Sequence, residues 1–590
     1  MKACDFIVDY LARMAGMKYV FTYAGGTNAM LLNSMVQHGG IQIVPMRHEQ
    51  NAALAADGYA KVKGDFGFAM AMSGPGATNL ITGITQSYFD SSPIFYLTGN
   101  VTTGTYKYDR PLRQLGYQET DIVSLVKPVT KGAYFVDSID RVPLVLRTAL
   151  RKIISGRTGP VLYDIPFDIQ KLDVDEKNLD IPFDLPSRTY LSSSEYQKFF
   201  SLLEASQRPV LLVGGGVHLS GTSGALAEFA RRFRLPVVSS LLGKDAFPND
   251  DPLYVGYIGV YGNRDANRIL SEADLAIALG SRIDSRQTAD VKEFVRNKKI
   301  IHVDIDPLVI GSTVEPELGI NMDLKDFFKD ISNRLEKSPV NWKPRETWLR
   351  AIDKVKELLR GYTEEDKGDL NPKKFLYKLS LAQVQGTLYT VDVGSHQMWS
   401  AQCCVLKQGD RFLTSGGLGT MGYAIPSAIG AHFASPHSPV VAIVGDGGFQ
   451  MSIPELSTIG EFNVPVKIVV MNNGMLGLMK NFQDENFDGV YPATIDGYAV
   501  PDISRIAQVY GLPARVVSND SDTDEAIEWL ARMESGAILE VKVPQAWGPY
   551  PKVIRGYGLS KQHPAIPDSL EKEIQQALSP EREVQQVVSK

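Results

Sequence analysis

Cysteine is scarce in this sequence of 590 residues, which contains only Cys4, Cys403 and Cys404. Since two of the three are adjacent and neighbours rarely bridge, we expect no structural disulfide. The net charge is −6, so no basic field attracts nucleic acid or an anionic membrane. No apolar run approaches the roughly 20 residues that span a bilayer. The first residues enter a helix pattern at once and leave no room for a signal peptide. We therefore expect a cytoplasmic protein with neither nucleic acid nor membrane as a partner.

The chain is too long for one hydrophobic core and should divide into about three or four domains. Short apolar strands alternate with helical stretches throughout, a pattern typical of parallel α/β units. Two polar stretches, residues 171–192 and about 338–370, interrupt this pattern, and we interpret both as linkers. The sequence thus predicts an α/β fold of three doubly wound parallel-sheet domains followed by a surface tail, at residues 1–170, 193–335, 371–550 and 551–590.

The most informative motif is Gly445-Asp446-Gly447, which directly follows an apolar strand pattern. A second apolar run is followed by Asn472-Asn473, and the spacing from Asp446 to Asn473 is 27 (473 minus 446). A carboxylate and an amide at two adjacent strand ends can share one Mg²⁺, which keeps further positions for water and phosphate oxygens. The glycines let the backbone approach a diphosphate. A Gly-Asp-Gly triplet on its own is more often a plain turn.

Together, the triplet and the asparagine pair resemble the signature of thiamine diphosphate (ThDP) enzymes. The resemblance implies that Mg²⁺ is held by Asp446, Asn473 and the backbone carbonyl of Met475. It also implies that the diphosphate lies against Gly445, Gly447 and Gly448.

In the first block, Glu49 lies where an apolar strand gives way to a helix pattern, the place where ligand-facing residues of open α/β sheets concentrate. A glutamate there is also favoured simply by the helix macrodipole. The loop Ser73–Asn79 follows the next strand and is either a tight turn or a close approach to a ligand. Arg47-His48-Glu49-Gln50, this loop and Gly159–Pro166 resemble the pyrimidine-binding domain of acetolactate synthases. The resemblance implies that Glu49 is catalytic and hydrogen-bonds the aminopyrimidine of ThDP.

The third block carries two further segments similar to this family. In Asp392–Trp399 the resemblance places Ser395 and His396 on the diphosphate, although His396 taken alone could equally be a buried structural histidine. In Thr414–Gly422 it gives Gly419 a carbonyl contact with the aminopyrimidine and puts Met421 beneath the cofactor. A methionine at such a position otherwise fills the core.

In the middle block, an apolar strand enters the glycine turn Gly214, Gly215, Gly216, which suggests a nucleotide-binding domain but is weak evidence alone. Arg282-Ile283-Asp284-Ser285-Arg286 resembles a step of the flavin-carrying acetolactate synthases, and Gly256–Asn263 resembles their flavin loop. The resemblance implies FAD, contacted by Arg282, Asp284, Arg286 and Asp304 in addition to the glycine turn. The two arginines could also form plain surface ion pairs, and many related domains bind nothing.

The acceptor pocket departs from the family. The family's aromatic–Gln pair is present as Tyr117-Gln118, with tyrosine for the usual phenylalanine. Phe167 replaces a lysine, and Phe482 replaces a tryptophan that favours 2-oxobutyrate. We assign Leu478 to the same pocket. The loss of a cation and the changed apolar wall point to an altered acceptor.

The resemblance therefore implies a ThDP- and Mg²⁺-dependent carboligase that decarboxylates pyruvate, or a similar 2-oxo acid, and transfers the two-carbon unit to a carbonyl acceptor. One alternative is a flavoprotein carboligase acting on a nucleotide-linked keto-sugar, and another is a decarboxylase or lyase that releases an aldehyde. A non-catalytic scaffold is disfavoured because Glu49, Asp446 and Asn473 are all present. Family sites combine two subunits, so we expect a homodimer or homotetramer; a regulatory subunit is possible.

Overall fold

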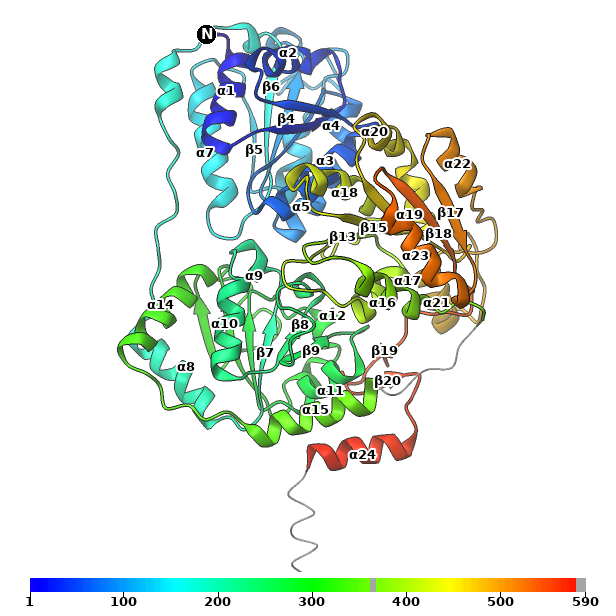
Figure 1. Ribbon diagram of the computed structural model, residues 1–590. Helices are drawn as coiled ribbons and strands as arrows, with labels where there is room; N and C mark the ends of the chain where they lie inside the picture. The colour runs from blue at the N-terminus through cyan, green and yellow to red at the C-terminus, as the bar shows by residue number, and fades with distance from the viewer. Residues whose placement is uncertain (361–367, 580–590) are drawn as a thin grey trace, which may run out of the picture.

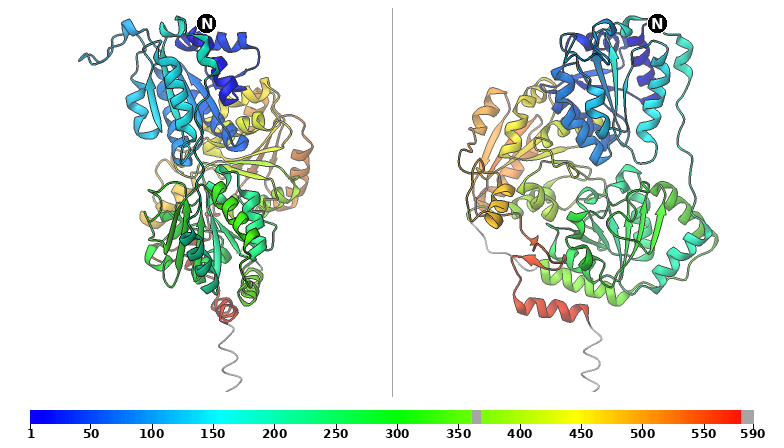
Figure 2. Two further views of the ribbon diagram at one scale, coloured as in Figure 1. Left: turned by 90° about the vertical axis from the view of Figure 1, so that its left-hand side faces the viewer. Right: turned by 180° about the vertical axis from the view of Figure 1, so that it is seen from behind.

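The computed structural model describes residues 1–360 and 368–579, and it contains three six-stranded parallel sheets. The three sheets confirm the predicted α/β fold. Figure 1 shows one domain around each sheet: the first at the top, the central one at the lower left, and the third on the right. The turned views of Figure 2 agree that the first and central domains lie at opposite ends, with the third domain beside both.

The first domain contains a sheet of strand order β2-β1-β3-β4-β6-β5. Its strands are β1 (Tyr19–Thr22), β2 (Gln42–Pro45), β3 (Gly67–Ala71), β4 (Ile94–Asn100), β5 (Gly132–Phe135) and β6 (Val161–Pro166). Its helices are α1 (Ala3–Ala15), α2 (Ala29–His38), α3 (Glu49–Lys63), α4 (Pro75–Asn79), α5 (Ile81–Asp90), α6 (Ile122–Val126) and α7 (Arg141–Ile154). Strands β3, β4 and β6 are buried along their whole length, which explains their continuous apolar runs.

The third domain repeats this topology, with strand order β14-β13-β15-β16-β18-β17. Its strands are β13 (Leu388–Val391), β14 (Arg411–Thr414), β15 (Val440–Gly445), β16 (Val466–Asn472), β17 (Ala514–Val517) and β18 (Ala537–Lys542). Its helices are α16 (Pro372–Ala382), α17 (Ser395–Cys403), α18 (Ala424–Ala434), α19 (Asp446–Ser452), α20 (Leu456–Glu461), α21 (Gly477–Asn486), α22 (Ile503–Val509) and α23 (Thr523–Arg532). In both domains the strand order reverses between the first and third strands, so each sheet has a crevice there.

The central sheet has a different order, β12-β11-β10-β7-β8-β9, which is the 3-2-1-4-5-6 order of dinucleotide-binding folds. Its strands are β7 (Pro209–Val213), β8 (Val237–Ser239), β9 (Tyr254–Tyr257), β10 (Leu275–Leu279), β11 (Lys299–Asp304) and β12 (Leu318–Asn321). Its helices are α8 (Ser193–Ala205), α9 (Gly216–Leu219), α10 (Ser223–Phe233), α11 (Arg264–Glu272), α12 (Ser285–Thr288), α13 (Val291–Phe294) and α14 (Leu324–Lys337). The reversal lies between β7 and β10, and it defines a third crevice.

Two segments, one between domains and one at the C-terminal end, differ from the sequence interpretation. Within the stretch 338–370, expected to be a linker, residues Glu346–Arg360 form the helix α15, whose Trp348, Ile352 and Val355 are buried in the central core. Its charged residues occupy the outer face, which made the stretch look like a linker. In the expected tail, β19 (Lys552–Val553) pairs with β20 (Gln562–His563), and α24 (Asp568–Leu578) packs beside α15 (Figure 1). Residues 361–367 of the linker and 580–590 of the tail lie outside the described residues.

Helix α3 of the first domain packs along helix α18 of the third. Their backbones nearly touch: a Cβ added at Gly58 would lie 2.2 Å from the Ser427 carbonyl oxygen, and one at Gly430 would lie 1.8 Å from that of Ala55. The two glycines are therefore required by close helix packing. Among the described residues, no helix combines the length and the apolarity needed to cross a membrane.

Candidate active site

The carboxyl edge of the third sheet gathers the residues expected around a diphosphate and a metal. Ser395 begins α17 shortly after β13, Asp446 begins α19 directly after β15, and Asn473 follows β16. Strands β13, β15 and β16 are neighbours in the sheet, so their carboxyl ends meet at one edge. The reversal of strand order falls between β13 and β15, the place where open α/β sheets bind ligands.

Distances around two glycines show how tightly these residues converge. A Cβ added at Gly477 would lie 2.6 Å from Ser395 Oγ and 2.9 Å from Asn473 Nδ2. A Cβ added at Gly445 would lie 2.8 Å from His396 Cε1. The structure thus brings Ser395, His396, Asp446 and Asn473 together, as the sequence spacing suggested, and leaves no room for larger residues at positions 445 and 477.

Two polar atoms at this edge are buried without a hydrogen-bond partner, Ser395 Oγ and His396 Nε2. An unpaired buried polar group costs about 1–3 kcal/mol, so such atoms call for a partner that the protein itself does not supply. Burial lowers the pKa of His396 to about 3, so its imidazole is neutral and one ring nitrogen carries a proton. The Ser395 hydroxyl can donate to a phosphate oxygen as it stands. One nitrogen of the His396 ring donates to the Asp392 backbone carbonyl, so Nε2 donates only when the ring takes up a second proton, which the negative charge of a phosphate favours. With that protonation the pair fits a diphosphate.

The carboxylate of Asp446 is buried and accepts a hydrogen bond of 3.2 Å from the Tyr498 hydroxyl. Burial raises the pKa of Asp446 to about 6, because removal from water disfavours the carboxylate more than its hydrogen bonds, among them the one from Tyr498, favour it. Asn473 Oδ1 lies 3.4 Å from the backbone nitrogen of Met475. No group of three or more His, Cys, Asp or Glu that could bind a metal occurs within residues 1–360 and 368–579. One carboxylate with amide and carbonyl oxygens nevertheless fits Mg²⁺, which retains water and phosphate ligands.

The glycine-rich loop before α18 lies beside this edge. Gly419 has φ +78°, and a Cβ added there would meet no atom within 4 Å, so its surroundings are open. Met421 is half-buried, and its Cε lies 3.1 Å from a Cβ added at Gly447. The loop of Gly419 and Met421 therefore borders the residues expected around the diphosphate.

Asp392, to which the sequence analysis gave no role, anchors the end of this loop. Its carboxylate accepts the backbone N–H groups of Gly422 at 3.0 Å and Ala424 at 2.9 Å. A Cβ added at Gly448 would lie 2.8 Å from Asp392 Oδ1, so Gly448 is explained by this contact without a ligand. The only sequence signal for Asp392 was its position directly after a strand.

Glu49 lies in the first domain, as the first residue of α3, and is buried. Its Oε2 accepts a hydrogen bond of 2.9 Å from Asn79 Nδ2, and its Oε1 lies 3.2 Å from a Cβ added at Gly76. The strand-end glutamate and the segment Ser73–Asn79 are therefore adjacent. Most of this segment, expected to be a loop, forms the short helix α4 (Pro75–Asn79).

Glu49 is nevertheless far from the third-domain loop of the same chain. Helix α3 runs from Glu49 to its last turn, where Lys61 Nζ donates to the Thr414 carbonyl and to the Tyr423 hydroxyl. Twelve residues of helix separate Glu49 from Lys61, a rise of about 18 Å. Glu49 and the loop beside Tyr423 thus lie near opposite ends of the α3–α18 pair.

The residues assigned to the acceptor pocket are divided between domains. Tyr117 is 86% exposed, and Gln118 (φ +63°) packs against Gly74 of the loop after β3. Phe167 follows β6, and the Lys171 ammonium lies 4.2 Å above the centre of its ring. A cation therefore remains near the position from which the family lysine is missing.

The other two pocket residues lie on α21 of the third domain. Leu478 is half-buried and Phe482 is 48% exposed, with the ring of Phe487 centred 6.0 Å away. The residues assigned to the pocket thus come from two domains of the chain.

A cleft of the central domain opens at the reversal between β7 and β10. It is lined by Gly215, Gly216, Arg282, Asp284, Arg286 and Asp304, and first-domain residues such as Arg157 reach its rim. Arg282 pairs with Asp284 at 3.0 Å, and Asp284 also accepts the backbone N–H groups that begin α12. Burial raises the pKa of Asp304 to about 6. The position of the cleft and the two arginines fit a dinucleotide pyrophosphate.

The glycine turn of this cleft has a packing role as well. A Cβ added at Gly214 would lie 2.1 Å from the Gly280 carbonyl oxygen, and one at Gly216 would lie 2.7 Å from Gly280 Cα. Gly214 does not line the cleft. Gly214 and Gly216 are thus required where the turns after β7 and β10 approach each other.

Domain models of known proteins match all three parts of the chain. Residues 1–125, 196–331 and 392–541 match the N-terminal TPP binding domain, the central domain and the C-terminal TPP binding domain of thiamine pyrophosphate enzymes. These matches cover well over half of the sequence, and the chain belongs to the thiamine pyrophosphate enzyme family. The family resemblance of the sequence motifs is confirmed.

Within this family, the chain is similar over almost its whole length to acetolactate synthases. It is 37% identical to a probable acetolactate synthase large subunit of Methanocaldococcus jannaschii over 88% of each chain. It is 34% identical to an acetolactate synthase of Arthrospira platensis, over 93% of this chain and 96% of the relative. It is 31% identical to the acetolactate synthase large subunit of Haemophilus influenzae, over 95% of this chain and 98% of the relative.

Proposed function

We propose that this protein is a ThDP- and Mg²⁺-dependent carboligase similar to acetolactate synthase. It decarboxylates pyruvate, or a similar 2-oxo acid, and transfers the resulting two-carbon unit to a carbonyl acceptor. The observation that carries this proposal is the pair of buried, unpartnered polar atoms Ser395 Oγ and His396 Nε2 beside Asp446 and Asn473. They lie in a matched TPP binding domain, at the edge of the sheet where a diphosphate is expected.

Each polar group has a distinct task in this proposal. Asp446, Asn473 and the Met475 carbonyl supply oxygen ligands to Mg²⁺, and Ser395 and His396 donate hydrogen bonds to the diphosphate. When bound, ThDP supplies the electron sink that decarboxylation of a 2-oxo acid requires.

The remaining groups orient the aminopyrimidine end of the cofactor. Glu49 accepts a hydrogen bond from the ring and controls its protonation, and the Gly419 carbonyl accepts one from the same ring. Met421 supports the cofactor from below, and its packing on Gly447 supports this placement.

The distance between Glu49 and the third-domain loop supports a site shared by two chains. Since α3 separates them by about 18 Å within one chain, Glu49 serves the cofactor held by a second copy. Exposed apolar side chains occur on both halves of such an interface, including Leu112, Leu115 and Tyr117 in the first domain, and Met479 and Phe482 in the third. The minimum unit is then a homodimer, which can pair further into a tetramer. Because some relatives are named large subunits, a regulatory subunit is a further proposed partner.

The identity of the acceptor depends on the side chains of the acceptor pocket. Phe167 and Phe482 favour an acceptor other than 2-oxobutyrate, and pyruvate is the first candidate. Lys171, poised above the Phe167 ring, supplies a cation for the carboxylate of a second 2-oxo acid. A nucleotide-linked keto-sugar is the second candidate, since its bulk suits a pocket that is open on the third-domain side. In the third alternative, the two-carbon unit is protonated instead of being transferred to an acceptor, and it leaves as an aldehyde.

We further propose that the central cleft binds FAD. Its support is the 3-2-1-4-5-6 strand order, the cleft at the reversal point and the arginines at positions 282 and 286. The bound flavin has no net redox role in the proposed reaction. Protein purified without added cofactor and then denatured with acid should release flavin in about one equivalent per chain, as measured by absorbance.

Product analysis tests the main proposal. Purified protein is incubated with ThDP, Mg²⁺, FAD and pyruvate as the sole substrate, and CO₂ and products are measured. Fast CO₂ release with accumulation of acetolactate supports the pyruvate acceptor. Slow CO₂ release without acetolactate indicates a missing acceptor, which keto-sugar nucleotides would then restore. Accumulation of acetaldehyde identifies a decarboxylase, and no CO₂ release even with added acceptors contradicts the proposed reaction.

A further inference from the structure

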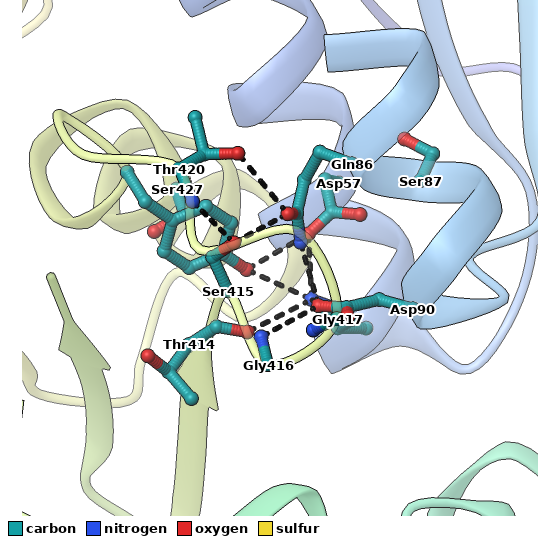
Figure 3. A network of polar contacts seen from close by, with 12 residues as sticks. Asp57, Gln86, Ser87, Asp90, Thr414, Ser415, Gly416, Gly417, Thr420 and Ser427 are labelled. Carbon is teal, nitrogen blue, oxygen red and sulfur yellow. Dashed lines mark hydrogen bonds and ion pairs between the residues drawn. The ribbon is translucent and has the colours of Figure 1, made fainter. Parts of the chain in front are cut away.

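A buried polar network joins the first domain to the glycine-rich loop of the third (Figure 3). From the first domain, α3 contributes Asp57 and α5 contributes Gln86 and Asp90. From the third domain, the loop Thr414–Thr420 lies directly opposite. Gln86, Ser415 and the Asp57 and Asp90 carboxylates are all buried. The network is part of the chain's own fold and does not belong to the residues already assigned to the metal or the diphosphate.

The Ser415 hydroxyl is fully used in this network. It donates its hydrogen to Gln86 Oε1 and accepts the backbone N–H groups of Gly419 at 3.0 Å and Thr420 at 2.8 Å. Gln86 Nε2 donates to Asp90 Oδ2 at 2.6 Å, which fixes the Gln86 amide with its oxygen toward Ser415. Because the hydroxyl hydrogen is held by Gln86, the lone pairs of Ser415 face the loop.

Asp90 holds the preceding part of the same loop. Its carboxylate accepts the backbone N–H of Gly417 at 2.7 Å and that of Gly416 at 3.3 Å. Burial alone would lower the pKa of Lys61, but Asp57 and Asp90 raise it well above its ordinary value. Two carboxylates thus face one ammonium, at 2.8 and 2.9 Å. The loop N–H groups supply part of the remaining compensation through charge-assisted hydrogen bonds.

The contact with Thr420 determines where the Gly419 carbonyl points. The Gly419 carbonyl and the Thr420 N–H belong to one peptide group, which is planar and trans, so the two bonds point in opposite directions. The Thr420 N–H points at Ser415 Oγ inside the domain interface. The Gly419 carbonyl therefore points away from that interface, at a residue whose surroundings are open.

We propose that Gln86 and Ser415 are positioning residues. They do not contact the cofactor themselves but orient the Gly419 carbonyl toward it. The inference rests on the proposed ThDP function, because it gives the open side of Gly419 an aminopyrimidine to meet. The first domain of each chain then has two tasks: it contributes Glu49 at one end of α3 and fixes the third-domain loop of its own chain near the other end.

Ser415→Ala tests this inference, with Ser87→Ala as its matched control. Ser87 is a buried serine on the same helix as Gln86, but its hydroxyl contacts Tyr96 and the Gly83 carbonyl, not the loop. Three quantities are compared: the dissociation constant of Mg²⁺–ThDP by fluorescence titration, the rate of hydrogen–deuterium exchange at C2 of bound ThDP by NMR, and the unfolding temperature of the cofactor-free protein.

Ser415→Ala is expected to slow the exchange roughly tenfold, in line with the loss of one hydrogen bond, while the dissociation constant changes little because the diphosphate contacts remain. Its unfolding temperature should match that of Ser87→Ala, and Ser415→Thr, which keeps the hydroxyl, should restore the exchange rate. Gln86→Met removes the same link from the first domain and should also slow the exchange, so the test stands if Ser415→Ala does not fold.

Equal exchange rates in Ser415→Ala, Gln86→Met and Ser87→Ala, with an active parent protein, would overturn the positioning role alone. A parent protein that neither binds ThDP nor catalyses exchange would overturn the proposed function as well. The two failures are therefore distinguishable.

Discussion

The side-chain amide of Asn79 donates a hydrogen bond of 2.9 Å to the carboxylate of Glu49. Asn79 is the last residue of α4, the short helix after β3, and Glu49 begins the helix after β2. A glutamine at position 49 can still accept this hydrogen bond through its carbonyl oxygen. Glu49→Gln therefore removes the charge of the carboxylate while it keeps the local geometry.

From this contact we predict that Glu49→Gln lowers kcat for pyruvate consumption by at least about 10²-fold, the usual contribution of an acid–base group. The binding of Mg²⁺–ThDP should remain within a few-fold of the parent, because the metal and diphosphate residues lie in the third domain. Activity and titration are measured on the same preparation. Near-normal turnover would remove Glu49 from the mechanism.

The second prediction concerns the shared site. Glu49→Gln and Asp446→Asn chains, each inactive alone, are combined by unfolding and refolding them together. A hybrid dimer has one site that combines an intact Glu49 with an intact Asp446, so the mixture should recover about a quarter of the parent activity. Each variant refolded alone is the control. If the mixture stays inactive although hybrids form, both groups act within one chain.

The third prediction concerns the acceptor. In competition between pyruvate and 2-oxobutyrate, the parent protein should show no preference for 2-oxobutyrate. The ring of Phe482 offers less apolar contact surface to the extra methylene of 2-oxobutyrate than a tryptophan ring would. Phe482→Trp should raise the preference for 2-oxobutyrate by about tenfold. This is the lower end of the discrimination that one methylene group gives in a complementary hydrophobic pocket. Phe487→Trp adds the same ring beside Phe482 and serves as the control. Product ratios measured by mass spectrometry decide between them, and a strong preference in the parent would refute the interpretation.

The fourth prediction concerns the flavin. Arg286→Ala should reduce the flavin that copurifies with the protein at least about tenfold, since a charge-assisted contact with the pyrophosphate is lost. Arg296→Ala removes an exposed arginine that pairs only locally with Glu293, and it should leave the flavin content unchanged. ThDP affinity is measured in both variants. If both variants keep the flavin content of the parent protein, Arg286 does not contact the flavin.

The fifth prediction concerns stability. Burial lowers the pKa of Lys298 to about 7, against a smaller rise caused by the charge of Glu272. Its ammonium donates to the Phe294 carbonyl and lies above the Phe294 ring. With the folded pKa below the unfolded one, the unfolded state binds more protons between about pH 7 and 10, so this residue lowers stability as the pH falls through that range.

Lys298→Met should accordingly raise the free energy of unfolding near pH 7 by about 1–3 kcal/mol and flatten its rise toward pH 10. Lys299→Met changes the exposed neighbour and is the control. Urea unfolding at several pH values provides the measurement. An unchanged or lower stability of Lys298→Met at pH 7 would contradict the expected cost of burying this lysine.

The sequence predicted that the residues proposed to bind the metal and the diphosphate meet at one sheet edge, because their positions are encoded locally. Ser395, Asp446 and Asn473 each follow a recognisable buried strand, and parallel strands deliver their carboxyl ends to one edge. The contact between Asp90 and Gly417 had no such signal. It joins residues 327 positions apart across two domains, and nothing in either local pattern indicates the partner.

Helix α15 was missed for a related reason. Its charged outer face dominated the composition of the stretch, while the buried residues are spread among polar ones, at Trp348, Ala351, Ile352, Val355 and Leu359. The glycine turn of the central domain was found, but two of its three glycines are explained by the approach of Gly280. Composition and motifs thus identify where a site lies more readily than which backbone contacts shape it.

The near-contact of α3 and α18 fixes the spacing between the first and third domains. Gly58 and Gly430 let the helices meet backbone to backbone, and any side chain at either position would act as a wedge. In the proposed dimer, one wedge would displace Glu49 from one reaction centre and the glycine-rich loop from the other. A single such substitution would therefore be dominant: a damaged chain paired with an intact one would impair both centres of the pair.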